Sequence, residues 1–323
     1  MAEKAHAPAF LGLGIPIVAV AEADSERRAL AARTLPGART YHGLEELLER
    51  EPSLDFMDIA TPPFLHGKQV LSALEHGLHV LCEKPLTLDL KEFDLIKNRS
   101  AASGRAVYTI HNWAHSPQWL TIAEIAASGR LGELRHAELH VLRTQPASDA
   151  MGGGWRCQAR LAGGGVLVDH GWHSLYLLHR LLRSPATGAS AALRRPSRDA
   201  VEEEATLLLE FRQATALVHL SWRAPERSNT ALLIGTRGIL DLKDDEIILK
   251  SGGAEERFPF PEKLSAGSAH PAWFLGMLEE TLRGIADSSP GNLAEAAFCL
   301  EAISRAYASQ GQPAAPREEV APA

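Results

Sequence analysis

The segment LDFMDIATPPFLHGKQVLSALEHGLHVLCEKP, residues 54–85, decides the fold that this sequence predicts. Its first seven residues form a short apolar run, which is typical of a buried strand. A turn containing two prolines then leads into a helical pattern that ends at Gly77, and a second apolar run ends at Pro85. A strand, a helix and another strand in this order favour two parallel strands joined by a crossover helix.

The same alternation extends over the first 110 residues. Apolar runs at 15–22 and 106–112 indicate further strands. Helical patterns occur at 24–35, 44–50 and 90–104, and the first of them begins with an Asp-Ser pair that suits a helix start. Strands that alternate with helices predict an α/β fold, a Rossmann-like doubly wound parallel sheet, for residues 1–110.

The pattern changes after residue 110. Alternating or apolar runs at 135–143, 205–211, 215–222, 231–236 and 239–250 predict strands, and helical patterns occur at 118–128, 168–182, 271–285 and 293–309. This mixture predicts an α+β domain with a large, mostly antiparallel sheet for residues 111–310. The segment GQPAAPREEVAPA, residues 311–323, is rich in Pro and Ala and is expected to be a disordered tail.

The composition excludes several classes of protein. The 323 residues are 45% hydrophobic and 23% charged, with a formal net charge of −7, which argues against a nucleic-acid-binding surface. No run approaches the roughly 18 apolar residues of a membrane helix, and the first residues lack the features of a signal peptide. Three scattered cysteines, Cys82, Cys157 and Cys299, indicate reduced thiols. We therefore expect a cytoplasmic protein that binds neither nucleic acid nor membrane.

Gly12 and Gly14, in LGLGIPIVAV (residues 11–20), form a Gly-x-Gly pair that superficially resembles a dinucleotide-binding loop. Such a loop follows a strand and opens a helix, whose free N–H groups then face the pyrophosphate. Here the order is reversed, because an expected helix over residues 2–11 comes first and the strand follows. Ile15 and Pro16 also break the glycine spacing. We expect a helix C-terminal turn with left-handed glycine instead.

Two histidine patterns resemble metal motifs. HAELH, residues 136–140, has its Glu at the wrong position for a zinc helix and lies in an expected strand. DHGWH, residues 169–173, has no evident third ligand. No metal site is expected.

Several motifs taken together resemble one known family. CEKP (82–85) follows TPPFLH (61–66) by the length of one helix, and GGGVLVDHGWH (163–173) comes later. VAVAE (18–22), HNW (111–113) and WR (155–156) add further matches. In this order and spacing they resemble the Gfo/Idh/MocA family of nicotinamide-dependent sugar and cyclitol oxidoreductases over nearly the whole chain. The resemblance implies a Rossmann domain that binds NAD or NADP, a second domain that holds the sugar, and assembly through the sheet face into a homodimer or homotetramer.

Compared with this family, the chain begins in the helix that follows the glycine loop. The family's first strand and Gly-rich turn have no counterpart in the sequence. In a doubly wound sheet this strand is central, so its absence removes two ladders of hydrogen bonds. Two interpretations are open: a mis-assigned start or truncated record, or a naturally shortened protein with weak or absent cofactor binding.

The resemblance assigns the chemistry to three residues. Lys84 matches the catalytic lysine, whose ammonium can hydrogen-bond the reacting oxygen. His173 matches the histidine that transfers the proton, a role that suits the near-neutral pKa of imidazole. Asp169 lies four residues earlier, where a helix would place it on the same face, so its carboxylate can orient the imidazole or contact substrate. A surface lysine, a core histidine and a helix N-cap are the structural alternatives.

The expected cofactor contacts come from two strand ends. Glu22 ends a strand where an acid bridges the adenosine ribose hydroxyls and repels a 2′-phosphate, which favours NAD over NADP. Arg27 and Arg28 lie nearby and suit either a 2′-phosphate or an exposed helix face. By resemblance, the TPPFLH loop contacts the nicotinamide side and Glu83 contacts the nicotinamide ribose. The full expected set is Glu22, Thr61, Pro62, His66, Glu83, Lys84 and Pro85.

The substrate side carries two departures from the family. The family more often has Arg where this chain has Trp113, an aromatic that either lies against a sugar ring or fills the core. It often has an acid where this chain has Tyr176. The expected substrate-binding set is Asn112, Trp155, Arg156, Asp169 and His173, with packing roles as the alternative for the first three.

These patterns predict an NAD(P)-dependent dehydrogenase that acts on a secondary hydroxyl or ketone of a sugar, cyclitol or derivative. The alternative is a non-catalytic relative that senses a cofactor or ligand and has lost the pyrophosphate loop.

Overall fold

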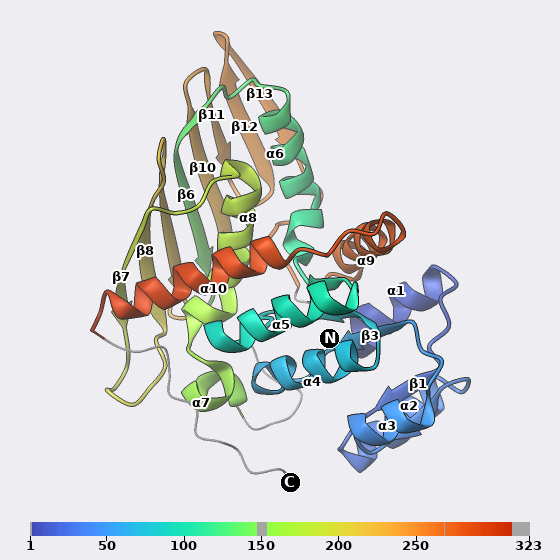
Figure 1. The fold of residues 1–323 in the computed structure, drawn as a ribbon. Coiled ribbons are helices and arrows are strands. Elements are labelled where there is room, and N and C mark those ends of the chain that lie inside the picture. The colour runs from blue at the N-terminus through green and yellow to red at the C-terminus, as the bar shows by residue number, and fades with distance from the viewer. Residues whose placement is uncertain (1, 147–153, 268, 312–323) are drawn as a thin grey trace.

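The computed structural model of the chain describes residues 2–146, 154–267 and 269–311. It has two regions: a smaller one of short parallel strands and helices, and a larger one built on an extended sheet (Figure 1). The expected disordered tail, residues 311–323, lies outside the described residues apart from its first residue. In the described part, no helix combines the length and hydropathy needed to cross a bilayer.

The first region contains parallel strands in two separate sheets. One sheet pairs β1 with β2, and the other has the order β3-β4-β5. The two sheets are not joined by hydrogen bonds among the described residues, so β1 and β3 each have an unpaired edge. The strands are β1 (Ala19–Ala21), β2 (Arg39–Tyr41), β3 (Phe56–Ile59), β4 (His79–Cys82) and β5 (Val107–Thr109).

Helices lie between these strands, as a doubly wound fold requires. Asp24 and Asp89 begin two of them by accepting a hydrogen bond from a backbone N–H three residues later. The helices are the π-helical η1 (Ala2–His6), α1 (Ala7–Gly12), α2 (Ser25–Thr34), α3 (Leu44–Arg50), α4 (Pro63–Glu75) and α5 (Leu90–Ser103).

The second region is an eight-stranded sheet of order β13-β12-β11-β10-β6-β9-β8-β7. Among these strands only β6 and β9 pair in parallel, and every other neighbouring pair is antiparallel. The strands are β6 (Leu134–Leu142), β7 (Gly188–Arg194), β8 (Glu204–Glu210), β9 (Thr215–Ser221), β10 (Ser228–Gly235), β11 (Gly238–Leu242), β12 (Glu246–Ser251) and β13 (Ala254–Pro259).

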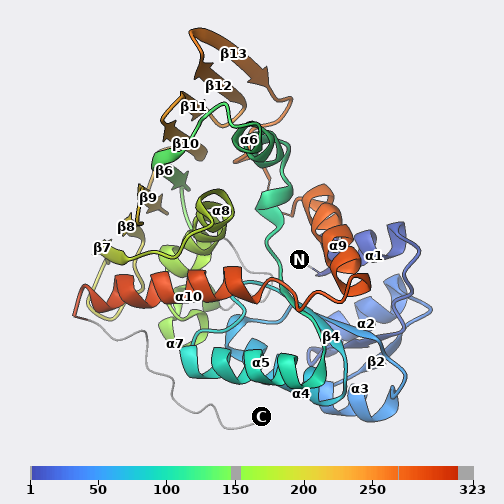
Figure 2. The same ribbon diagram turned by 45° about the horizontal axis from the view of Figure 1, so that its top comes forward.

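Helices cover one face of this sheet and leave the other open (Figures 1 and 2). Strand β6 shows the reason, because buried Ala137, Leu139 and Val141 alternate with more exposed, mostly polar residues. The remaining helices are η2 (Asn112–His115), α6 (Pro117–Ala127), η3 (Trp155–Cys157), α7 (Ala159–Ala162), the π-helical η4 (Leu167–Gly171), α8 (Trp172–Leu182), α9 (Pro271–Ala286) and α10 (Leu293–Ala308).

Helix α9 comes late in the chain yet lies beside η1 and α1 of the first region (Figure 2). Phe274 stacks on the ring of His6 with 4.0 Å between ring centroids, and Ala5 and Phe10 belong to the same buried cluster. The two regions are therefore joined by shared core as well as by the connecting chain.

The fold class predicted from the sequence is confirmed: parallel Rossmann-like strands precede a large, mostly antiparallel sheet. The helix expected before Gly12 is present, and Gly14 adopts a φ of 70° after it, as a helix C-terminal turn requires. The strand expected over 15–22 is limited to Ala19–Ala21. Strands β2, β7 and β13 were not predicted, because their sequences show little apolar alternation.

Candidate active site

Lys84 and Asp169 form the ion pair at the centre of the candidate site. Lys84 follows β4, and Asp169 lies in η4 of the second region. Lys84 Nζ donates to Asp169 Oδ1 at 2.7 Å and to the Asp169 carbonyl oxygen at 2.5 Å. Burial alone would raise the pKa of Asp169, but Lys84, His170 and Arg156 hold it well below its usual range. The pair is thus an ammonium and a carboxylate that are largely shielded from solvent.

His173 lies in a buried pocket of aromatic rings. Trp113 stacks on the imidazole with 4.3 Å between centroids and an interplanar angle of 8°. The Tyr176 hydroxyl lies 3.0 Å from His173 Nδ1. Burial, reinforced by Lys84, lowers the pKa of His173 well below its usual value. The imidazole is therefore neutral at neutral pH.

The expected contact between Asp169 and His173 is not what the structure shows. Asp169 Oδ2 lies 3.4 Å from His170 Nδ1, while Oδ1 binds Lys84. The physical reason is the π-helical turn of η4, which changes the rotation between Asp169 and the start of α8. The residue that orients His173 is Tyr176, three positions further along α8.

The glycine triplet before η4 fixes where Asp169 lies. A Cβ atom on Gly165 would lie 2.0 Å from the carbonyl oxygen of Glu202. The close approach lets the Glu202 carboxylate accept hydrogen bonds from Gly165 N at 2.8 Å and Leu167 N at 3.2 Å, while Tyr307 donates a third at 2.8 Å. Backbone N–H groups at the start of a helix lack acceptors within the helix, and the Glu202 carboxylate accepts from two of them at the start of η4.

His66 connects two of the loops expected to contact a cofactor. Its ring is fully buried, with Nδ1 2.7 Å from the Pro85 carbonyl oxygen and Nε2 2.7 Å from that of Thr61. The Thr61 hydroxyl donates to Gln69 at 2.6 Å, and Pro62 lies at the N-cap of α4. The His66 side chain is therefore engaged with the protein, where it ties the TPPFLH loop to the EKP loop.

Glu83 is engaged by a residue that sequence reasoning did not single out. His6 of η1 lies between two carboxylates, with Nδ1 2.8 Å from Asp58 Oδ2 and Nε2 3.2 Å from Glu83 Oε1. Asp58 is the penultimate residue of β3, and Glu83 directly follows β4, so both partners of His6 are far from it in sequence. No local spacing signals this cluster, because it joins η1 to two different strands.

Glu22 directly follows β1, as predicted, and its carboxylate is already paired. Arg27 of α2 donates to both oxygens, each at 3.1 Å, and Arg28 donates to the Glu22 carbonyl oxygen at 2.7 Å. The carboxylate and the two guanidinium groups thus stand together at this strand end. The acid expected to bind the ribose and the arginines expected near a 2′-phosphate are therefore in contact with one another.

The residues expected on the substrate side lie in different elements. Asn112 is buried beside Trp113 in η2, and the Arg143 guanidinium lies 5.8 Å from the Trp113 ring centroid. Arg156 lies 4.3 Å over the ring of Trp155 in η3. Burial and the neighbouring Arg227 lower the pKa of Arg143 to about 10. Arg143 was not predicted, and its position after a strand of alternating residues gives no local signal for it.

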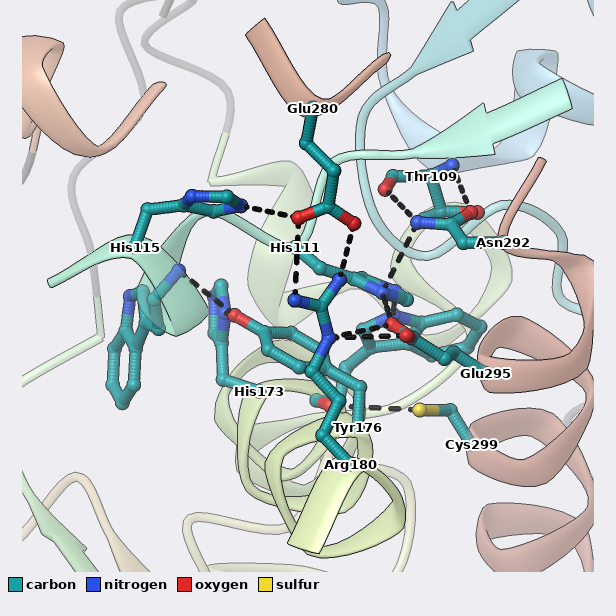
Figure 3. Close-up of polar contacts among 12 residues, drawn as sticks. Thr109, His111, His115, His173, Tyr176, Arg180, Glu280, Asn292, Glu295 and Cys299 are labelled. Atoms are coloured by element: carbon teal, nitrogen blue, oxygen red, sulfur yellow. Dashed lines mark hydrogen bonds and ion pairs between the residues drawn. The ribbon is translucent and has the colours of Figure 1, made fainter. Parts of the chain in front are cut away.

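A network of hydrogen bonds and ion pairs lies next to this pocket (Figure 3). His111 Nδ1 lies 2.6 Å from Glu295, whose other oxygen accepts from Arg180 at 3.0 Å. Arg180 also binds Glu280 at 3.1 Å, and His115 lies 3.0 Å from the same carboxylate. Burial would raise the pKa of Glu280, but His115 and Arg180 lower it to about 2. The network joins α8, α9 and α10 to the end of β5.

Comparison with known proteins identifies the family. Residues 1–111 match the oxidoreductase family with an NAD-binding Rossmann fold, and residues 119–241 match the GFO/IDH/MocA C-terminal domain. These two matches follow each other in the same order as the two regions of the fold. The chain therefore belongs to the Gfo/Idh/MocA family of oxidoreductases.

Named relatives match parts of the chain. An uncharacterized oxidoreductase, ORF334 of Rhizobium meliloti, is 36% identical over 38% of this chain and 36% of its own length. The 1,5-anhydro-D-fructose reductase of Ensifer adhaerens is 28% identical over 57% of this chain and 54% of its own. The scyllo-inositol 2-dehydrogenase (NADP(+)) IolW of Bacillus subtilis (strain 168) is 27% identical over 53% and 46%. The matched part spans about half the length of these relatives, or less.

Solved structures match nearly the whole chain. A levoglucosan dehydrogenase in complex with NADH and levoglucosan has a TM-score of 0.83 and 19% identity, covering 96% of this chain and 95% of that one. GenD2 from gentamicin A biosynthesis, in complex with NAD, has a TM-score of 0.79 and 24% identity, covering 95% and 90%. At these identities the similarity concerns the fold.

Proposed function

We propose that this protein is an NAD(P)-dependent oxidoreductase that acts on a secondary hydroxyl or ketone of a sugar, cyclitol or derivative. The observation that carries the proposal is the Lys84–Asp169 pair at 2.7 Å, next to the buried, neutral His173. An ammonium and an imidazole beside one another suit a reacting oxygen that gains and loses a proton. The named relatives include a reductase and a dehydrogenase for such substrates.

Part of the cofactor is matched by residues present in the structure. Glu22 at the end of β1 would face the adenosine ribose, and the loops that His66 joins would face the nicotinamide side. The Glu22 carboxylate favours NAD, whereas the Arg27 guanidinium paired with it suits the 2′-phosphate of NADP, so NAD is favoured only slightly. No Gly-x-Gly turn joins a strand to a helix among the described residues of this region, so backbone groups for the pyrophosphate are not assigned.

The residues of the site divide the work of the reaction. A bound nicotinamide supplies or accepts a hydride. Lys84 donates a hydrogen bond to the reacting oxygen and exchanges a proton with it, while Asp169 holds Nζ in place. His173 contacts the same oxygen, and Trp113 fixes its ring plane by stacking. Trp155 and Arg156 would hold the remaining hydroxyl groups of the substrate.

A cofactor- or ligand-sensing role is the second candidate. The separation of the β1–β2 sheet from the β3–β4–β5 sheet favours it, because a split sheet weakens the platform on which a dinucleotide lies. A sensor would bind a ligand without converting it. Turnover of any substrate therefore separates the two candidates.

The decisive experiment is a fluorescence titration of NADH and NADPH into the protein, followed by a turnover screen. The screen uses levoglucosan, scyllo-inositol and 1,5-anhydrofructose first, with Lys84→Ala as the control. We expect binding of the reduced cofactor and turnover that the Lys84→Ala variant lacks. Ligand binding without turnover would transfer the assignment to the sensor, and turnover that survives Lys84→Ala would contradict the assigned site.

The open face of the large sheet is proposed to pair with a second copy of the chain, as a homodimer or as part of a homotetramer. Leu208 and Ile239 lie on this face with 43% and 42% of their surface exposed. Exposed apolar residues on an uncovered sheet favour contact with another sheet. Light scattering on the protein and on Leu208→Glu tests the proposal. A monomer in the unmodified protein would contradict it.

A further inference from the structure

Tyr176 occupies a fully buried position from which its hydroxyl reaches two groups (Figure 3). The backbone N–H of Trp113 donates to the hydroxyl oxygen at 3.0 Å. His173 Nδ1 lies 3.0 Å from the same oxygen. His111 stacks on the tyrosine ring with 4.1 Å between centroids, which prevents the phenol from moving away. The hydroxyl therefore lies between a backbone N–H, which can only donate, and a ring nitrogen, which donates or accepts depending on the tautomer of His173.

In the hydrogen bond between Tyr176 and His173, the tyrosine hydroxyl is the donor. An amide N–H can only donate, so Tyr176 accepts from Trp113. The hydroxyl has one proton of its own, and His173 Nδ1 is the only acceptor for it among the described residues. Were Nδ1 to carry a proton instead, the Tyr176 O–H would be left buried without a partner. That arrangement is disfavoured by roughly ten- to a hundredfold in population.

The ionisation states of both residues are compatible with this count. Burial raises the pKa of Tyr176 well above its usual value, so the hydroxyl keeps its proton. Burial lowers the pKa of His173, so the ring carries a single proton. If the Nδ1 atom accepts from Tyr176, that proton is on Nε2. No described residue forms a hydrogen bond with Nε2.

We propose that Tyr176 is a positioning residue that fixes His173 in its Nε2–H tautomer, so that the imidazole offers a hydrogen-bond donor to the substrate oxygen. The identity of that oxygen rests on the proposed function, whereas the tautomer does not. A carboxylate at position 176 would accept from Nδ1 and leave Nε2 as an acceptor. Tyrosine at this position thus reverses the polarity of the ring toward the substrate.

The tautomer divides the roles of Lys84 and His173. When the reacting oxygen gains negative charge, a Lys84 Nζ–H bond breaks and an O–H bond forms. The neutral amine then takes a proton from solvent. This differs from the expectation from the sequence, in which His173 transfers the proton: here His173 keeps its Nε2 proton and stabilises the charge by hydrogen bonding. In the opposite direction, the Lys84 ammonium first loses a proton to solvent, and the resulting amine then takes the hydroxyl proton.

The test is a proton–nitrogen correlation spectrum of the full chain with isotope-labelled histidine, recorded near neutral pH without cofactor. The two tautomers give different nitrogen shifts, and His173→Gln assigns the signal. We expect a protonated Nε2 and an unprotonated Nδ1 in the unmodified protein. In Tyr176→Phe we expect the signal to move toward a mixture of tautomers. Tyr108→Phe is the matched control, because Tyr108 is also buried but does not contact His173.

A protonated Nδ1 in the unmodified protein would overturn the proposal, even if the Tyr176→Phe variant does not fold. An unchanged tautomer in folded Tyr176→Phe would also overturn it. Once a substrate is known, Tyr176→Phe is expected to lower kcat by roughly fivefold or more, with cofactor affinity unchanged. Because the spectrum needs neither cofactor nor substrate, failure to find turnover would count against the proposed function alone.

Discussion

Replacing His6 with Gln should remove a pH dependence from the stability of the protein. Burial would lower the pKa of His6, but the carboxylates of Asp58 and Glu83 together raise it from 6.5 to about 9. The folded protein therefore keeps a proton on His6 that the unfolded chain has lost between these two values. The imidazolium also ties η1 to the ends of β3 and β4, so its loss loosens the N-terminal helix.

The magnitude follows from the linkage between proton binding and folding. Stability from His6 is fully present below about pH 6.5 and is lost as the pH rises through about 9. Over this window the free energy of unfolding falls by about 1.4 kcal/mol per pH unit, which amounts to about 3 kcal/mol in total. Histidines whose pKa values are lowered by burial, such as His170, titrate below this window and do not contribute to it.

The assay is urea denaturation at a series of pH values from about 6 to about 10. The unmodified protein should lose stability across the window, and His6→Gln should start lower and show a flatter profile. His76→Gln is the matched control, because this exposed ring bonds only the Ser72 carbonyl oxygen. Equal pH dependence in the unmodified protein and in His6→Gln would refute the reasoning.

Four further substitutions test other parts of the structure, and one of them, Gly12→Ala, is the control for Gly165→Ala. Lys84→Ala should abolish turnover while the NADH affinity from a fluorescence titration stays within a few-fold, and normal turnover would discard its catalytic role. Gly165→Ala should lower the melting temperature, since its Cβ would lie 2.0 Å from Glu202 O, at a cost of about 1–3 kcal/mol or more. Gly12→Ala, with open space around it, should cost less than about 1 kcal/mol, and equal losses would contradict this. Glu22→Gln should shift cofactor preference several-fold toward NADPH in paired titrations, because the carboxylate that repels a 2′-phosphate is gone; an unchanged ratio would contradict that role.

Much of the architecture could be predicted because it depends on local patterns. The apolar runs that form β3 and β4, and the helix between them, are clear in the sequence. Strand β2, with the residues Arg39–Tyr41, carries no such pattern and exists because β1 pairs with it. The packing of α9 against η1 is set by contacts between residues more than 250 positions apart in the chain, which periodicity does not encode.

The candidate site was predictable to the extent that motifs carry it. Lys84 and Asp169 were singled out from separate motifs, and the structure brings them to 2.7 Å. The link from Asp169 to His173 was expected from helical spacing, and the π-helical turn of η4 removes it. Tyr176 was noticed as a departure from the family, but its contact with His173 depends also on the backbone of Trp113. His6 gave no signal, since its partners are distant in sequence.

The path of the chain between the two regions limits how they can be separated. After β5 the chain enters the second region, returns with α9 to cover η1 and α1, and then runs back along the large sheet as α10. A fragment ending near residue 110 would expose the apolar side of Phe10 and Tyr108 that Phe274 and Met277 cover. The complementary fragment would expose Phe274 and Met277, because the apolar surface that they pack against would be absent. The regions are thus distinct in sequence but interdependent in folding, and fragments divided at this boundary should be recovered as a reassembled pair rather than as independent domains.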